Sequence, residues 1–203
     1  MSEMYQMEVF YYSFLNEVNK RISMETYKGN LEQYTSCIMD VINSIINRTC
    51  KAQNEYFRID AVGWTTSSEE YEEDGNKVGL NAHVWDLKIA VEHENSVKDW
   101  TDEVIKLLHV RCPLKVVIGY NHYDIRYDED DNESDNRKLE FVAKCMKKVK
   151  AFEDQSKEDY LIIIGNAKGK KKHDSAYTEF GYRGYYYDYQ RGCFIDINER
   201  KNL

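Results

Sequence analysis

Apolar residues recur at intervals of three and four in four segments of the chain, which is the periodicity of amphipathic helices. These segments are 4–22, 31–48, 97–108 and 136–152. In front of the third segment, Ser96 and Asp99 resemble a helix cap with its acidic partner three residues further on. The sequence therefore predicts four helices, each with one buried face.

Runs of β-branched and aromatic residues predict strands between and after these helices. The predicted strands are 56–64, 84–94, 114–120 and 160–165, followed by a hairpin of 180–189 with 193–197. Its many tyrosines predict exposed aromatic edges for this hairpin. Two acidic, turn-rich stretches, 65–77 and 123–135, predict solvated loops.

The segment 84–94 alternates between two faces with period two. Glu92 and Glu94 share one face and lie about 6.6 Å apart along the strand. With the helix that follows and the strand 114–120, this segment predicts a βαβ unit with parallel strands. The glutamate pair then lies at the carboxyl end of a central strand, where open α/β sheets commonly bind ligands.

Composition favours one globular domain over residues 1–203. The chain has 42% hydrophobic and 32% charged residues, a single proline and a net charge of −8. The five widely spaced cysteines include no CxxC pair, so we expect neither a disulfide framework nor a zinc knuckle and predict a reducing, cytoplasmic location. No apolar run approaches the roughly 18 residues of a membrane span. The predicted fold class is α/β, with a central mixed β-sheet flanked by helices.

A helix, a strand bearing Asp60, a strand ending in Glu92-x-Glu94, a second helix and a parallel strand resemble the PD-(D/E)XK nuclease superfamily. The resemblance covers about 31–120 and implies a restriction-endonuclease-like core. Helix 4–22 would precede this core, and a helix and hairpin at 136–197 would follow it. By the same resemblance, Asp60 and Glu92 would bind Mg²⁺ or Mn²⁺, and Asp60, Glu92 and Glu94 would be catalytic.

The sequence departs from the family pattern because Glu94 occupies the position of the motif lysine and no proline precedes Asp60. Some restriction endonucleases of this superfamily carry E-x-E, and a migrated lysine is the other interpretation. The family also often adds an acid from the preceding helix. The candidate supporting residues are Lys98 and Lys106 from the following helix, and Glu32 and Asp40 from the preceding one.

These features predict a metal-dependent endonuclease acting on DNA, of a restriction-like, phage or mobile-element kind, with a homodimer as one assembly left open. Because the net charge is negative, nucleic-acid binding must be local. The candidate contacts are Lys168, Lys170, Lys171, Lys172 and Arg183. The competing hypothesis is a non-catalytic nucleic-acid-binding or protein-interaction module that retains the nuclease fold. In either case, His93 is predicted to pack on the side of its strand opposite the glutamates.

Overall fold

The computed structural model describes residues 7–23, 25–26, 29–66, 70–80, 85–121, 131–153, 158–166 and 181–202. Within these residues the fold is α/β, with a seven-stranded mixed sheet flanked by helices, as predicted. The strands are β1 (Lys51–Tyr56), β2 (Ile59–Thr66), β3 (Trp85–His93), β4 (Leu114–Asn121), β5 (Asp159–Asn166), β6 (Tyr182–Asp188) and β7 (Cys193–Asp196). The helices are α1 (Met7–Arg21), α3 (Leu31–Ile46), α4 (Glu70–Lys77), α5 (Trp100–Leu107) and α6 (Asp131–Met146), with 3₁₀ turns η1 (Lys150–Phe152) and η2 (Ile197–Asn202).

The strands lie side by side in the order in which they occur in the chain. β3, β4 and β5 are parallel, and all other neighbouring strands are antiparallel. The predicted βαβ unit is therefore confirmed, with α5 as the connection between β3 and β4. The predicted C-terminal hairpin is also confirmed, as β6 and β7.

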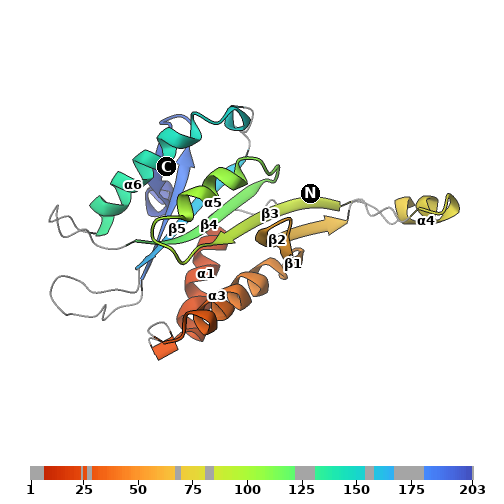
Figure 1. Ribbon diagram of the computed structural model, residues 1–203, viewed down its shortest axis with the longest axis horizontal. Coiled ribbons are helices and arrows are strands. Elements are labelled where there is room, and N and C mark those ends of the chain that lie inside the picture. Colours follow the sequence, from red (N-terminus) through yellow and green to blue (C-terminus); the bar gives the residue numbers. More distant parts are fainter. Residues whose placement is uncertain are drawn as a thin grey trace.

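Helices cover both faces of this sheet (Figure 1). One core lies between the sheet and α1 with α3, and it includes Ile38, Ile89 and Val91. The second lies between the sheet and α5 with α6, and it includes Ala90 and Val117. Strands between two helical layers are buried on both sides, and every residue of β4 is accordingly buried.

The predicted strand 56–64 is confirmed from Ile59 on as β2, but its start is wrong, because the chain reverses at Phe57 and Arg58. β1 ends at Tyr56 and pairs with β2, and the turn between them places Phe57 and Arg58 at φ of 49° and 64°. Tight hairpin turns with positive φ usually contain Gly, Asn or Asp. The sequence here has none of these, so the usual turn signal is missing.

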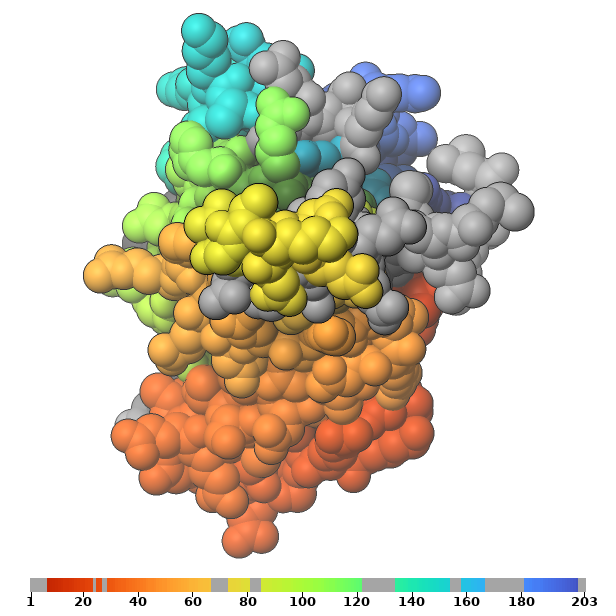
Figure 2. Space-filling view, turned by 90° about the vertical axis from the view of Figure 1, so that its right-hand side faces the viewer, coloured from red at the N-terminus to blue at the C-terminus, as the bar shows by residue number. Residues whose placement is uncertain are grey.

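Three other features also differ from the predictions. The stretch 65–77 is not all loop, because it contains α4, which lies beyond the ends of β2 and β3 (Figure 1) and therefore in front of the other elements in Figure 2. α6 begins at Asp131, inside the predicted loop 123–135, and ends at Met146 rather than at 152. Ser96 is not the cap of α5, whose first flanking residue is Asp99.

Gly119 of β4 allows α5 to pack directly on the sheet. A Cβ atom at this position would lie 2.7 Å from Cγ of Trp100, the first residue of α5, which is buried. We expect Gly119→Ala to destabilise the fold by about 1–3 kcal/mol, because overpacking forces the helix or the ring to move. Thermal melts should show this loss. The control Gly181→Ala, whose Cβ would meet no atom of the described residues closer than 3.6 Å, should melt like the wild type.

Candidate active site

The structure brings Asp60 of β2 and Glu92 of β3 together. The antiparallel register pairs Ala61 with Val91, which places the two acids opposite each other at the next position. The Asp60 backbone N–H donates to Glu92 Oε2 at 3.4 Å. Asp60 Oδ2 accepts a hydrogen bond from the backbone N–H of His93 at 2.8 Å. The two acids thus share one end of the β2–β3 pair.

Glu92 faces the α5 side of the sheet and is only 1% exposed. Its Oε1 lies 2.7 Å from Nζ of Lys106, which projects from α5. The same ammonium group pairs with Glu103, one helical turn earlier, and donates to the backbone carbonyl of Arg58 at 3.0 Å. The candidate active site therefore comprises the Lys106 amine, the carboxylates of Glu92 and Glu103 that pair with it, and Asp60 beside Glu92.

The environment of Glu92 raises the pKa of its carboxyl group from 4.5 to about 8. Burial is the largest cause, and the negative charges of Asp60 and Glu103 act in the same direction. Lys106 opposes them but does not outweigh them. Perturbed carboxyl groups of this kind are characteristic of functional sites. Fully ionised, the four side chains carry a net charge of −2, which one divalent cation would compensate.

The donor set fits Mg²⁺ better than a metal held entirely by protein. Among the described residues, no three His, Cys, Asp or Glu side chains form a group that could hold a metal ion alone. Mg²⁺ usually keeps several waters and binds through one or two carboxylates together with substrate phosphates. Asp60 and Glu92 are two neighbouring carboxylates of the kind that such a site would use.

Glu94 does not join this cluster but bonds locally to the main chain of Ser96. Its Oε1 accepts from the backbone N–H of Ser96 at 2.6 Å, just after β3 has ended. Glu32 and Asp40 are exposed on α3, which packs against the opposite face of the sheet. Neither the E-x-E pairing nor an α3 acid is thus assembled around Glu92 in this structure.

Of the two candidate lysines, Lys106 contacts the site, whereas Lys98 is exposed just before α5. Glu103 was not among the residues predicted from the sequence. Its spacing of three residues before Lys106 on the same helix is the signal that identifies such a pair.

His93 packs on the other side of β3, as predicted. Its Nε2 lies 2.8 Å from the hydroxyl of Tyr120, which in turn donates to the Tyr34 hydroxyl at 2.9 Å. This buried position lowers the pKa of His93 from 6.5 to about 4. The imidazole is therefore neutral at physiological pH and lies on the face opposite the carboxylates.

The basic residues predicted to bind nucleic acid are only partly described. Lys168, Lys170, Lys171 and Lys172 lie outside the described residues. Arg183 on β6 is half-buried and donates from its guanidinium to Asn166 Oδ1 at 2.7 Å and to Asp135 Oδ2. The predicted exposed aromatic edges are wrong, because the tyrosines at 182, 185, 186 and 187 are buried, on one face of the sheet or the other.

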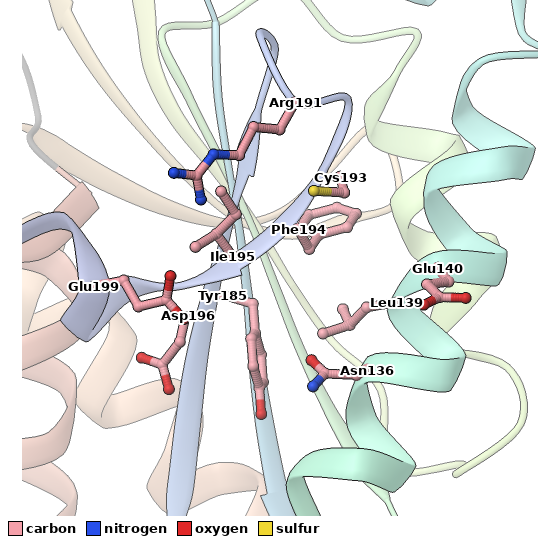
Figure 3. A pocket seen from close by; sticks show the side chains of 10 residues that line it. All are labelled: Asn136, Leu139, Glu140, Tyr185, Arg191, Cys193, Phe194, Ile195, Asp196 and Glu199. Carbon is pink, nitrogen blue, oxygen red and sulfur yellow. The ribbon is translucent and has the colours of Figure 1, made fainter.

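A pocket of about 430 Å³ lies near the opposite edge of the sheet, where α6 faces β6 and β7. Figure 3 shows Glu140 on the α6 side and Asp196 and Glu199 on the other side, with Arg191 above them. Three carboxylates to one guanidinium make this pocket a poor receptor for phosphate groups. It is therefore a weaker candidate for a nucleic-acid site.

The α/β fold and the buried carboxylate cluster define the candidate site from geometry alone. No family model matches this sequence, and no curated protein or solved structure matches the chain. Within the described residues, no helix is long and apolar enough to cross a membrane.

Proposed function

We propose that this protein is a metal-dependent endonuclease that hydrolyses phosphodiester bonds of DNA. The proposal rests on one observation above all, the contact of Lys106 with Glu92 beside Asp60. In the nuclease superfamily that the sequence resembles, an Asp on one strand and an Asp/Glu on the next form the site together with a lysine. Here the amine comes from α5 instead of from position 94, as a migrated lysine would.

The order of elements supports the same proposal. A helix, antiparallel strands, a connecting helix and a parallel strand occur in the order α3, β1, β2, β3, α5 and β4, with α4 inserted between β2 and β3. This arrangement includes the order on which the resemblance rests and adds β1 at the edge.

Each side chain has a role in this mechanism. Asp60 and Glu92 would hold the cation, which on binding neutralises charge on the phosphate and lowers the pKa of a coordinated water. The Lys106 ammonium, already pointing at Glu92, would orient the attacking water and stabilise developing negative charge. Glu103 would keep this amine protonated and in place, since its carboxylate raises the pKa of Lys106. Glu92 would hold the cation as a carboxylate, with its proton released to solvent.

The burial of Glu92 is the observation that favours the alternative, a binding module without catalysis. With 1% of its side chain exposed and Lys106 across it, the carboxylate has little access to solvent. Under this alternative the Glu92–Lys106 pair ties α5 to β3 and does nothing more.

Replacing Lys106 distinguishes the nuclease from the non-catalytic binding module. The wild-type protein should cleave DNA with Mg²⁺ or Mn²⁺ and stop on chelation. Lys106→Met should lower the single-turnover rate by about 10²–10⁴-fold, the usual contribution of a positioned acid or base. We expect this variant to fold, because Glu92 can take up a proton when Lys106 is removed. Circular dichroism would verify the folding.

The matched control is Lys144→Met, an exposed lysine on α6, which should cleave like the wild type. Equal cleavage by the Lys106 and Lys144 variants would remove Lys106 from the mechanism. Absence of cleavage by the wild type on both duplex and single-stranded DNA, with either metal, would favour the binding module.

A further inference from the structure

The two-residue turn between β1 and β2 is unfavourable for its own backbone. Phe57 and Arg58 occupy its central positions, because Tyr56 pairs with Ile59 on either side of them. Both have positive φ, of 49° and 64°, and Glu55 has a φ of 52°. Hairpin turns of this kind usually contain Asn-Gly, since Gly reaches positive φ at no steric cost. A phenylalanine and an arginine at these positions therefore reduce the stability of the hairpin.

The side chain of Phe57 is also unfavourably placed for the core. It is 81% exposed, the highest value among the large hydrophobic residues that the structure describes. The ring of Tyr56 meets that of Phe57 at nearly a right angle, with the centroids 4.6 Å apart. This contact orients the Phe57 ring but leaves most of it in solvent. Neither the turn nor the core therefore explains a phenylalanine here.

The turn lies directly beside the candidate active site. The backbone carbonyl of Arg58 accepts a hydrogen bond from Lys106 Nζ at 3.0 Å, and the same amine pairs with Glu92. Asp60 follows Phe57 by three residues, which span at most about 11 Å. This span corresponds to about three steps of a DNA strand, at 3.4 Å per nucleotide. A strand whose phosphate reached Asp60 and Glu92 would therefore pass within reach of Phe57.

Arg58 adds a cation to the same turn. Its side chain is exposed and pairs with no carboxylate among the described residues. The planar guanidinium group can donate two parallel hydrogen bonds to one phosphate. The exposed Glu55 carries the opposite charge and would repel a phosphate. The turn thus combines one exposed ring, one available cation and one opposing acid.

We infer that this turn inserts into duplex DNA beside the scissile bond, with the Phe57 ring between two neighbouring bases and the Arg58 guanidinium on a phosphate. Proteins that kink DNA insert apolar side chains, Phe among them, between base steps and partly unstack them. Residues held at unfavourable φ cluster at functional sites, which supports such a role for this turn. The inference rests on the proposed nuclease function and adds that the substrate is bound as a distorted duplex.

Binding can be measured without cleavage, using the Glu92→Gln protein in the presence of a chelator. The probes are a fluorescein-labelled duplex of mixed sequence and a copy in which 2-aminopurine replaces several adenines. Because 2-aminopurine brightens when it is unstacked, we expect its fluorescence to rise on binding. Phe57→Ala should abolish this rise and weaken binding about tenfold or more, the usual loss when a ring that stacks on a base is removed. Phe57→Trp should retain both signals.

The charges of the turn can be tested separately. Arg58→Gln should reduce the slope of log K against log salt by about 0.9, the contribution of one duplex phosphate. Glu55→Gln should instead strengthen binding, because it removes a repelling charge. The matched controls lie on α6, where Lys144 and Phe141 are both exposed. Lys144→Gln should leave the salt slope unchanged, and Phe141→Ala should bind the duplex as tightly as the unsubstituted protein.

Replacing the whole turn should move stability and binding in opposite directions. The double variant Phe57→Asn with Arg58→Gly introduces the usual residues of such a turn. It should melt at a higher temperature, because the backbone strain is relieved, and it should bind the duplex more weakly. A residue pair retained for folding alone would not give this combination.

The inference fails if Phe57→Ala and Phe141→Ala bind alike, if the 2-aminopurine signal does not rise, or if the Asn-Gly turn binds as tightly as the original. Failure of the proposed function is distinguishable from these outcomes. If Phe57 supports binding in a protein that cleaves no DNA with either metal, the nuclease is refuted and the DNA-binding turn stands. If the wild type cleaves DNA and the turn variants cleave and bind equally well, the nuclease stands and the turn has no part in it.

Discussion

Glu92→Gln should abolish cleavage and, in the absence of metal, make the protein more stable. The loss of cleavage should reach about 10³-fold, because a metal ligand supports several kcal/mol of transition-state stabilisation. The gain in stability follows from the buried charge. A carboxyl group whose pKa is raised by burial resists ionisation, and glutamine has the same shape without this cost.

The sign of the pH dependence follows from the pKa of Glu92, which is 4.5 when unfolded and about 8 when folded. Its contribution to stability is complete below pH 4.5 and is lost as the pH rises through 8, because the unfolded chain releases the proton more readily. Each pH unit in this window costs about 1.4 kcal/mol. The free energy of unfolding of Glu92→Gln should therefore exceed that of the wild type by on the order of 4 kcal/mol at pH 8. At pH 5 the difference should be under about 1 kcal/mol.

The acid side of the same curve provides an internal control. Folding lowers the pKa of His93 from 6.5 to about 4, so both proteins should lose stability as the pH falls from 6.5 to 4. The groups that face His93 are the hydroxyls of Tyr34 and Tyr120, whereas those that face Glu92 are Asp60, Glu103 and Lys106. Urea denaturation of Glu92→Gln at several pH values should show the same loss of stability toward acid pH as in the wild type. The loss of stability toward alkaline pH should be absent.

Adding Mg²⁺ or Mn²⁺ should reduce the difference in stability between the two proteins at pH 8. A cation that binds only the folded wild type stabilises it by about 2.7 kcal/mol at a hundredfold excess over Kd. Glu92→Gln should show no such shift. If cation raises the melting temperature of both proteins equally, Glu92 is not a ligand. If Glu92→Gln loses stability as the pH rises through 8 just as the wild type does, the carboxyl group of Glu92 is not the group that titrates in this range.

The βαβ unit was predictable because its signals are local. The apolar runs of β3 and β4 and the amphipathic helix between them lie within a short segment, and parallel pairing follows from the crossover. The β1–β2 hairpin could not be predicted in this way, because Phe57 and Arg58 adopt positive φ without the usual turn residues. There, the pairing of the strands determines the turn.

The burial of Glu92 could not be predicted from the alternation of side chains along β3. Period two indicates two faces, and polar residues on one of them suggest exposure. That face is covered by α5, so that Ala90 and Glu92 are as buried as their apolar neighbours. Lys106 was one of several candidate lysines, and only the packing of α5 on β3 selects it.

The pair of Lys115 and Glu158 should give the second large effect, on stability alone. Lys115 of β4 has no exposed side-chain surface, pairs with Glu158 and donates to the Tyr160 hydroxyl at 2.7 Å. Burial lowers the pKa of this lysine, and Glu158 opposes the shift. The pair lies at the amino end of the parallel strands, away from the carboxylate cluster, since Lys115 is aligned with Tyr160 near the start of both β4 and β5.

Removing the two charges one at a time should have unequal consequences. Glu158→Gln leaves a buried ammonium group without its carboxylate and should cost about 3 kcal/mol or more. Lys115→Met should cost less, because Glu158 is 16% exposed and can be solvated. The double variant should regain most of the loss, because a buried pair replaced by groups of similar volume is often close to neutral. Urea denaturation of the wild type, the two single variants and the double variant at one pH measures these differences. If Lys115→Met is as unstable as Glu158→Gln, then charge attraction rather than desolvation determines the stability of this pair.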